Sequence, residues 1–471
     1  MLKQDDIIEL TIEKLIYSGT SLSHFEGRAV FVDNAVPGDV IKARVLRINK
    51  NFIRAKILEI ITPSIHRIKP FCPLFNACGG CNLQNIEYDF LIEQKQKILE
   101  EIFNEKNSPA FAALEFKPFI KSPKLKEYRC KVQNRAGETK VSKRLLIGYY
   151  KENTHDITNI KFCPIQPKII DEITEFIREN WKLGAYIEKK DKGLLKHILM
   201  RYSSSDNKII LTLVINKDFE WFDKVKPDIK IFSDALMARF PDIAGVLVNF
   251  NPNKTNKITG EITETLCGAD FIYQKLYSKN GIEYTYKVSK DSFFQINPPV
   301  ASILFDAAKA MVKPNSTILD AYGGVGAIGI FLKDKAKKIT LVEESKSAVS
   351  DAKENFKLNN CENYEVFLGD AKEIFKSFIN PKNTPKNAGK NPQISFDYAI
   401  LDPPRKGSDK EALEIISKLA KTIIYISCNP STLCRDAKIL YEFGFKIKSI
   451  QGADMFPFTH HIESIACFEK E

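Results

Sequence analysis

A cysteine placed directly after a strand is the first feature that could do chemistry. Residues 425 to 436 read YISCNPSTLCRD, and Cys428 follows the apolar run Thr422 to Ile426 just before Asn429 and Pro430 break the strand pattern. Strand ends are where α/β enzymes commonly place their reactive groups. A lone cysteine there could also be a small hydrophobic residue that closes the strand. As a thiolate, it would be a nucleophile for an electrophilic substrate.

Candidate acid–base groups lie close to the C-terminus, in FPFTHHIESIACFEK. His460, His461 and Glu463 come just before another apolar run, so an acid–base group could share an edge with Cys428. Glu463 could equally be the partner of a salt bridge, and the sequence alone leaves both interpretations open.

A glycine-rich turn indicates a cofactor site. In NSTILDAYGGVGAIGIFL an apolar strand ends at Asp320, and Gly324, Gly326 and Gly329 follow in the order G-x-G-x-x-G before a helix. Glycines at this spacing let the backbone approach a ligand closely. The next strand, KKITLVEES, ends at Glu343, nineteen residues beyond Gly324, where a carboxylate would receive ribose hydroxyls.

Two further strands end in carboxylates, YEVFLGDA at Asp370 and FDYAILDPPRKG at Asp402. Because parallel strands end at one edge of a sheet, we expect these strands to deliver their carboxylates together. Several carboxylates would repel a pyrophosphate, whereas S-adenosylmethionine carries a sulfonium and an ammonium and has no phosphate. The edge therefore favours S-adenosylmethionine over NAD, and a ligand-free structural sheet is the remaining alternative.

Cysteines with metal-ligand spacing form a third candidate site. CPLFNACGGC places Cys72, Cys78 and Cys81 as C-x5-C-x2-C, and KFCPIQP adds Cys163. Four thiolates suit a soft metal ion or an iron–sulfur cluster. The spacing is unusual for a zinc finger, so it favours a cluster over zinc, with uncomplexed thiols as the third alternative.

The elements that must position these groups fall into three regions. Residues 6 to 62 alternate β-rich runs with turns, which predicts a small barrel of about five strands of the oligonucleotide-binding type. Apolar spacing predicts a helix from Tyr88 to about Asn104, and from about residue 295 strands and helices alternate as in a doubly wound α/β sheet. We predict a barrel at 1–62, a mixed α/β central domain with the cysteine loop at 63–290, and a Rossmann-like domain at 291–471.

Composition and charge fit a globular protein with a polyanionic partner. Of 471 residues, 44% are hydrophobic and 27% charged, a balance typical of soluble proteins. No apolar run reaches the ~18 residues of a membrane span, and the start, MLKQDDIIEL, lacks the features of a secretory signal, so we expect the cytoplasm and no membrane. The net charge of +11, and nine Lys or Arg against two Glu in residues 121 to 144, indicate nucleic-acid contact or a solvated basic face.

Nearly the whole chain resembles the RNA uracil C5-methyltransferases. The resemblance is to the branch that carries an N-terminal TRAM domain and a 4Fe-4S cluster and methylates uridines of 23S ribosomal RNA. The segments that carry it are VFVDNAVPGD, CPLFNACGGCNLQ with Cys163, YRCKVQ, DSFFQIN, DAYGGVGAIG, LDPPRKG, YISCNPSTLCRD and HHIES. It implies a doubly wound Rossmann-like fold behind the barrel, an S-adenosylmethionine cofactor, an RNA partner and a monomer.

The resemblance also implies roles for individual residues. Cys428 matches the nucleophile that adds to uracil C6, Glu463 matches the base that removes the C5 proton, and Asp402 lies near both the cofactor and the reacting base. Arg405 or Arg435 could favour the thiolate by proximity. The other cofactor positions are Gln295, Tyr322, Glu343 and Asp370, with Gly324 and Gly326 of the glycine turn, and the cluster ligands are Cys72, Cys78, Cys81 and Cys163.

The chain departs from the family pattern at a few positions. Cys130 replaces the usual asparagine of YRNK, Gly323 stands where cysteine or serine is frequent, and Ala327 removes a side-chain contact to the cofactor. We interpret the basic insert at 380–393 as a tolerated surface loop.

Three alternatives remain open from the sequence. The same reaction could act on the T loop of transfer RNA, since no residue reads out a target sequence. Methylation of the amino group of adenine also uses a D-P-P motif, but it has no use for Cys428. A non-catalytic RNA-binding iron–sulfur protein would use only the barrel and the basic stretch.

Overall fold

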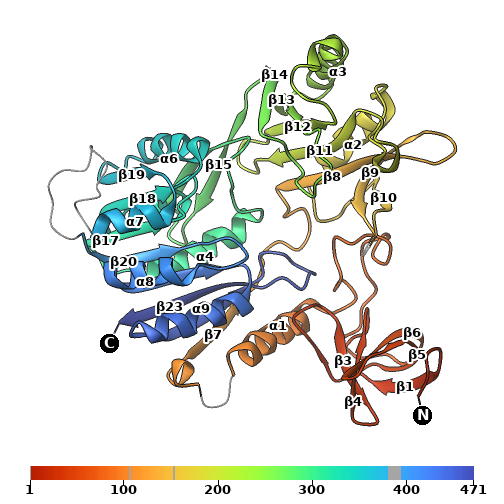
Figure 1. Cartoon of the computed structure of the whole chain (residues 1–471), viewed down its shortest axis with the longest axis horizontal. Helices are drawn as coiled ribbons and strands as arrows, with labels where there is room; N and C mark the ends of the chain where they lie inside the picture. Colours follow the sequence, from red (N-terminus) through yellow and green to blue (C-terminus); the bar gives the residue numbers. More distant parts are fainter. Residues whose placement is uncertain (1, 105–107, 152–153, 380–393, 471) are drawn as a thin grey trace. The chain divides into compact units, whose positions relative to one another are not determined.

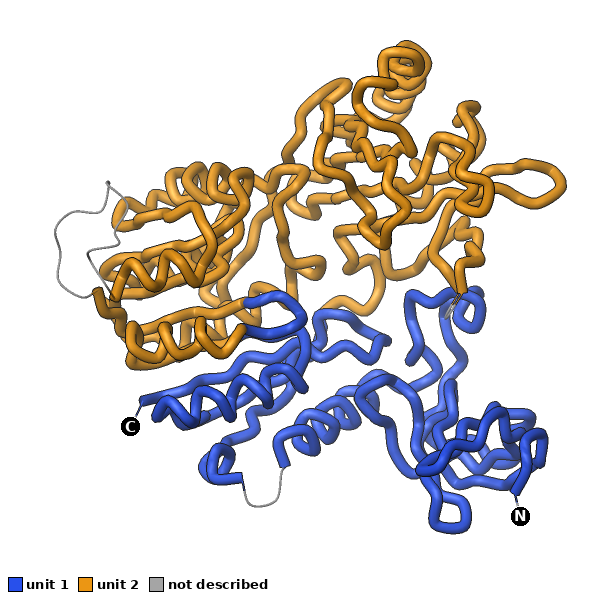
Figure 2. Tube along the Cα trace, in the orientation of Figure 1, with its two compact units in different colours: residues 1–122, 403–408, 426–471 blue, residues 123–402, 409–425 orange. Residues whose placement is uncertain are grey.

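The computed structural model describes residues 2–104, 108–151, 154–379 and 394–470, and the insert at 380–393 lies outside them. Its chain forms two compact units (Figure 2). Unit 1 contains residues 1–122, 403–408 and 426–471, and unit 2 contains residues 123–402 and 409–425. The division at 1–62, 63–290 and 291–471 remains a prediction.

Unit 1 begins with a six-stranded sheet that surrounds its own hydrophobic core, here called the barrel (Figure 1). Residues in β1 and β5 alternate between buried and exposed, which is the period-two pattern of a half-buried strand. The sixth strand, beyond the expected five, is the two-residue β2. The strands, in the sheet order β1-β5-β6-β4-β3-β2, are β1 (Ile7–Thr11), β2 (Lys14–Leu15), β3 (Ser21–Phe25), β4 (Arg28–Val32), β5 (Val40–Ile48) and β6 (Phe52–Thr62).

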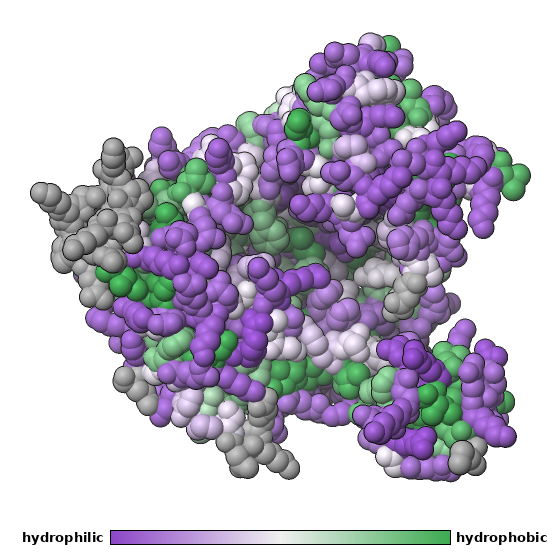
Figure 3. Space-filling model, viewed as in Figure 1, coloured by the Kyte–Doolittle hydropathy of each residue, from purple (hydrophilic) through white to green (hydrophobic). Residues whose placement is uncertain are grey.

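The barrel also exposes hydrophobic side chains. Ile7, Leu46, Leu58 and Ile61 are examples. On the face that Figure 3 shows, hydrophobic residues lie among the hydrophilic residues of the barrel surface. Among the described residues, no helix is both long and apolar enough to cross a membrane.

The rest of unit 1 combines helices with three strands. The predicted helix is confirmed as α1 (Tyr88–Phe103). The strand order is β23-β22-β7, with β22 and β23 antiparallel and β22 and β7 parallel. The remaining elements are η1 (Pro109–Phe111), β7 (Glu115–Ile120), α9 (Pro430–Glu442), β22 (Phe445–Ala453) and β23 (Glu463–Lys470).

The first part of unit 2 is a seven-stranded mixed sheet in the order β10-β9-β8-β11-β12-β13-β14. Its hydrophobic core includes residues of α2 and α3, such as Ile173 and Leu236. The elements are β8 (Lys131–Glu138), β9 (Leu145–Tyr150), β10 (Ile157–Asn159), α2 (Lys168–Asn180), η2 (Glu188–Lys190), β11 (Leu195–Tyr202), β12 (Ile209–Ile215), η3 (Phe222–Lys224), α3 (Lys226–Arg239), β13 (Ile243–Phe250) and β14 (Ile262–Gly268), and the hairpin β15 (Phe271–Tyr277) and β16 (Glu283–Ser289) follows.

The second part of unit 2 is a parallel sheet with the strand order β19-β18-β17-β20-β21, which confirms the expected alternation of strands and helices. The chain passes from unit 2 to unit 1 within β21. The elements are α4 (Pro298–Met311), β17 (Ser316–Ala321), α5 (Ala327–Phe331), β18 (Ala336–Glu343), α6 (Lys346–Leu358), β19 (Tyr364–Leu368), α7 (Ala371–Ile379), β20 (Phe396–Leu401), α8 (Lys410–Leu419) and β21 (Ala420–Ser427).

Candidate active site

Cys428 lies directly after β21, in a turn that hydrogen bonds fix on both sides. The backbone N–H of Asn429 donates to the Ser427 hydroxyl at 3.1 Å, and this hydroxyl lies 3.1 Å from the Asn429 carbonyl. Asn429 also caps α9, because its Oδ1 accepts from the Ser431 N–H at 3.1 Å. The half-buried thiol is therefore held between a strand end and a helix N-cap.

Glu463 is the first residue of β23 and is 4% exposed. The next residue, Ser464, donates from its hydroxyl to the Ser427 carbonyl at 3.2 Å. This bond joins the start of β23 to the end of β21, so the carboxyl and the thiol belong to neighbouring positions of unit 1.

The loop between β22 and β23 is anchored by a buried ion pair. Lys95 of α1 donates to Asp454 at 2.6 Å and to the His461 carbonyl at 3.0 Å, and both charged side chains are at most 1% exposed. The Tyr88 hydroxyl donates to the other oxygen of Asp454 at 2.9 Å. These bonds fix the loop that leads into Glu463.

The cysteine loop contacts the same segment. The N–H groups of Asn82 and Leu83 donate to the Phe458 carbonyl at 3.3 and 3.1 Å, and the Asn82 amide lies 3.2 Å from Nδ1 of His460. Burial lowers the pKa of His460, and the positive charges of Lys95 and Arg405 lower it further. His460 is therefore a neutral imidazole at physiological pH.

Tyr17, in the turn between β2 and β3, interacts electrostatically with Cys428, Arg405 and Glu463. Burial raises the pKa of its phenol to about 12, the charges on Cys428 and Glu463 add to this rise, and Arg405 opposes it. A thiol, a carboxyl and a guanidinium of unit 1 therefore act on one hydroxyl.

Of the two arginines expected near Cys428, Arg405 acts electrostatically on the Tyr17 hydroxyl. Arg435 instead supports the loop at 403–408, donating to the Lys406 carbonyl at 2.8 Å and to Asp436 at 2.6 Å. Gly407, at φ +76°, has no room for a side chain beside Arg435 and Asp436. Arg435 thus shapes the loop that carries the exposed Arg405.

The glycine turn of unit 2 leaves space for a ligand. Tyr322, Gly324 and Gly326 all have positive φ, and a Cβ on Gly324 would meet nothing within 4 Å. The Gly324 N–H donates to Glu343 at the end of β18 at 3.0 Å, and Glu343 also accepts from the Ser345 N–H at 2.8 Å. The turn is therefore fixed while its outer face stays open.

Three carboxyls interact beside this turn. Burial raises the pKa of Asp320 to about 7; the hydrogen bond from the Gly329 N–H opposes this, and the charges on Asp402 and Glu343 add to it. Burial also raises the pKa of Asp402 to about 7, although part of this residue remains open to solvent. Such a group of acids is short of positive charge and suits a cationic ligand.

Of the other two expected cofactor residues, Asp370 lies beside the end of β18, because the Gly369 N–H donates to the Glu343 carbonyl at 3.0 Å. Asp370 is exposed and accepts from the Glu373 N–H at 3.1 Å in the first turn of α7. Gln295 is half-buried in the segment before α4 and lines a small cavity with Lys131 and Arg201. Burial lowers the pKa of Lys131 to about 8, and Arg201 lowers it further.

The expected metal ligands are divided between the two units. Cys72, Cys78 and Cys81 are half-buried in unit 1, where the Gly80 N–H lies 3.4 Å from Cys78 Sγ, and Cys163 belongs to unit 2. Within the described ranges, no three His, Cys, Asp or Glu side chains are close enough to hold a metal ion. The cluster therefore remains a prediction.

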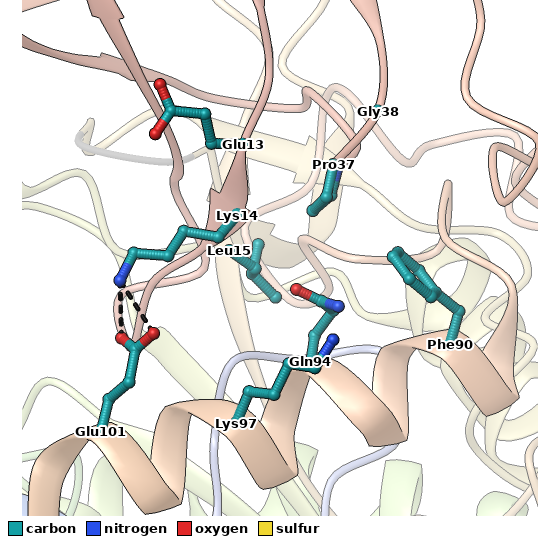
Figure 4. Close-up of a pocket in the computed structure, with 9 residues that line it drawn as sticks. All are labelled: Glu13, Lys14, Leu15, Pro37, Gly38, Phe90, Gln94, Lys97 and Glu101. Carbon is teal, nitrogen blue, oxygen red and sulfur yellow. Dashed lines mark hydrogen bonds and ion pairs between the residues drawn. The ribbon is translucent and has the colours of Figure 1, made fainter. Parts of the chain in front are cut away.

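A larger pocket of about 370 Å³ lies between the barrel and α1 (Figure 4). It is lined by charged and apolar side chains, including Lys14, Leu15, Phe90 and Glu101, and by none of the expected catalytic or cofactor residues.

Sequence reasoning missed four residues of this site: Tyr17, Asn82, Lys95 and Asp454. Lys95 lies on a helix predicted from its apolar spacing, which says nothing about a buried charge. Asp454 lies 359 residues from Lys95, and Tyr17 lies 412 residues from Asn429. No local motif marks these pairs.

Two family models match the chain. The model of the tRNA (uracil-5-)-methyltransferase family matches residues 87–471, and the model of the TRAM domain matches residues 4–58. The second match covers most of the barrel and confirms the TRAM domain expected there.

Relatives similar along the whole chain are named as uncharacterized RNA methyltransferases. One from Halalkalibacterium halodurans is 33% identical and covers 99% of this chain and 97% of its own length. Another, from Oceanobacillus iheyensis, is 34% identical and covers 98% and 96%.

One solved structure is similar over nearly the full length. It is the crystal structure of Pyrococcus abyssi tRNA (uracil-54, C5)-methyltransferase in complex with S-adenosyl-L-homocysteine, with a TM-score of 0.71 and 25% identity. The match covers 98% of this chain and 100% of that one, and it confirms the α/β methyltransferase fold.

Lys95→Met is expected to lower the free energy of unfolding by about 3–5 kcal/mol, because it leaves the buried Asp454 carboxylate without its cation. Urea unfolding followed by circular dichroism measures this loss. Lys14→Met, which breaks the exposed ion pair with Glu101, is the matched control and should change little. Equal effects of the two substitutions would contradict the anchoring role of Lys95.

S-adenosylmethionine should bind about tenfold more tightly at pH 8 than at pH 6. Asp320 and Asp402 have raised pKa values, so at pH 6 a cationic ligand must displace a proton from such a carboxyl, while at pH 8 the carboxylate is already charged. Isothermal titration calorimetry at both pH values measures the ratio. S-adenosylhomocysteine, which lacks the sulfonium charge, should show a smaller ratio, and equal ratios would count against the carboxyl cluster as the cation site.

Proposed function

Because the chain belongs to the tRNA (uracil-5-)-methyltransferase family, we propose that it transfers a methyl group from S-adenosylmethionine to C5 of a uridine in RNA by way of a covalent adduct with Cys428. The observation that carries this proposal is the bond from the Ser464 hydroxyl to the Ser427 carbonyl at 3.2 Å, which places Glu463 and Cys428 at neighbouring positions of unit 1. The charges of both residues also raise the pKa of the half-buried Tyr17 phenol. A thiol nucleophile and a carboxylate base at one place suit covalent catalysis. Family membership and the RNA methyltransferase relatives argue against a non-catalytic RNA-binding protein.

The Cys428 thiolate is proposed to activate C5 of the uracil for methylation. Uracil C5 is a weak nucleophile, and addition of the Cys428 thiolate to C6 moves the C5–C6 π electrons toward O4, leaving C5 as an enolate carbon. S-adenosylmethionine, when bound, supplies the electrophilic methyl group. Arg405, which acts on Tyr17 together with Cys428, is proposed to favour the thiolate form of Cys428 by proximity.

Glu463 completes the reaction. After C5 has gained the methyl group, the Glu463 carboxylate accepts the C5 proton, the C–H electrons restore the C5–C6 double bond, and the bond from C6 to sulfur breaks. The thiolate is thereby regenerated. Methylation of adenine would give neither Cys428 nor Glu463 a role.

We propose that unit 2 holds the cofactor at the glycine turn. The open space at Gly324 and the carboxyls of Glu343 and Asp402 support this assignment. Asp402 is also proposed to face the reacting base. By family resemblance, the other contacts come from Gln295, Tyr322, Gly326 and Asp370.

A 4Fe-4S cluster on Cys72, Cys78, Cys81 and Cys163 belongs to the same proposal. The three half-buried thiols of unit 1 lie in a loop that turns tightly, with the Cys78 N–H bonded to the Leu74 carbonyl at 2.9 Å. Since methyl transfer from this donor moves no net electrons, the cluster would organise the loop rather than take part in a reaction step.

Cys72→Ala should lose the brown colour and the bound iron of protein prepared without oxygen, because the cluster needs four thiolates. Visible absorbance and iron analysis measure both. Cys361→Ala, which removes another half-buried thiol, is the matched control and should keep them. Full absorbance in Cys72→Ala would refute this ligand assignment.

We propose ribosomal RNA as the substrate, on the resemblance carried by the TRAM segment and the cysteine loop. Transfer RNA is the second candidate, because the similar Pyrococcus abyssi protein is named as an enzyme for uracil 54 of tRNA. Methylation of the two folded RNAs, compared in parallel, distinguishes the candidates.

RNA carrying 5-fluorouridine should form a denaturation-stable adduct with the protein in the presence of S-adenosylmethionine. Fluorine at C5 cannot leave as a proton, so the covalent intermediate accumulates. Gel electrophoresis under denaturing conditions detects the adduct, and Cys428→Ala should abolish it while Cys434→Ala retains it. If neither folded ribosomal nor transfer RNA gives an adduct, the covalent route is wrong.

A further inference from the structure

We propose that the barrel supplies a positioning residue to the reaction centre: the hydroxyl of Tyr17 holds Asn429, and thereby the turn that presents Cys428. The inference rests on the function proposed above and adds a residue from outside the methyltransferase part of the chain. It makes the barrel part of the reaction centre as well as an RNA-binding domain.

The contact joins the barrel to the residue next to the nucleophile. Tyr17 Oη donates to Asn429 Oδ1 at 3.3 Å, and the same oxygen accepts from the Ser431 N–H at 3.1 Å. Asn429 thus receives one bond from the barrel and one from α9. The 3.3 Å distance is long for a hydroxyl donor, so the bond contributes a modest free energy.

The turn that carries Tyr17 is seated tightly against the loop that leads to Glu463. Bonds between Ile16 and Thr20 and between Gly19 and Ile16 close the turn, and Gly19 has φ +80°. A Cβ on Gly19 would collide with the Asn82 amide and lie 2.9 Å from Cβ of His460. The Tyr17 ring also meets the His460 ring edge-on, with 6.5 Å between centroids.

Helix α1 lies beside the barrel near this turn. Figure 4 shows Lys14 reaching Glu101, with 2.8 Å between Nζ and each carboxylate oxygen, while Gln94 and Lys97 extend from the same helix toward the barrel. Leu15, two residues before Tyr17, is 2% exposed. The helix that carries Lys95 therefore also borders the segment that leads into the turn of Tyr17.

The phenol is suited to this role because it remains a donor. Burial raises the pKa of Tyr17 to about 12, so the hydroxyl keeps its proton throughout the range in which the enzyme would work. Removing it takes a donor from Asn429 and leaves the ring in place against His460.

Tyr17→Phe should slow adduct formation on 5-fluorouridine RNA about threefold at saturating RNA, with the affinities for RNA and cofactor unchanged. Tyr277→Phe, at an exposed tyrosine of β15, is the matched control and should match the wild type. An unchanged rate in Tyr17→Phe, or a loss confined to RNA affinity, would overturn the positioning role.

A second variant tests whether Tyr17 acts through Asn429. Asn429→Ser keeps an N-cap oxygen for α9 but is too short to reach the phenol, so it should give a similar loss. In the double variant the losses should not multiply, because both remove the same bond. Multiplying losses would show that Tyr17 acts on another group.

Alkylation of Cys428 by iodoacetamide needs no RNA. It therefore tests the role of Tyr17 independently of the proposed methyl transfer. Peptide mass spectrometry should find Cys428 labelled about threefold faster in Tyr17→Phe, since the turn opens more often, while Cys267 and Cys361 of the same sample label at the wild-type rate. Unchanged labelling of Cys428 would overturn the role of Tyr17, whereas a wild-type protein that forms no RNA adduct would overturn only the covalent route.

Discussion

The buried ion pair between Lys95 and Asp454 fixes the loop that leads into the proposed reaction centre of unit 1. Two charges at most 1% exposed are stable only when they satisfy each other, so α1 and the loop after β22 must meet in one geometry. The same lysine holds the His461 carbonyl, and the cysteine loop binds the Phe458 carbonyl. Glu463 follows directly from this fixed loop.

The proposed chemistry divides between two kinds of environment. In unit 2, carboxyls with raised pKa values surround an open glycine turn and favour a ligand that brings positive charge. In unit 1, a thiol and a carboxyl interact electrostatically with a half-buried phenol, whose pKa is raised chiefly by burial. Each environment suits one reactant: the sulfonium donor in the first and the neutral uracil ring in the second.

The sequence predicts the parts of this site that follow from local rules. Cys428 directly follows one apolar strand and Glu343 ends another, and both apolar runs are visible in the sequence. The spacing of its glycines predicts the glycine turn. The roles of Lys95 and Tyr17 could not be predicted in the same way. Their partners lie hundreds of residues away in the sequence and are brought into contact only by tertiary packing. The cysteine spacing predicts a cluster, but spacing alone cannot state whether the four thiols converge.

In the proposed reaction, Cys428 bonds to C6 of the uridine before Glu463 removes the C5 proton. The most direct measurement uses Glu463→Gln with ordinary uridine RNA and S-adenosylmethionine labelled in the methyl group. A stable protein–RNA adduct should form, in which mass spectrometry finds the label on a uracil attached to Cys428, because release needs the missing base. Labelled RNA released at the wild-type rate, with no adduct, would contradict this reaction.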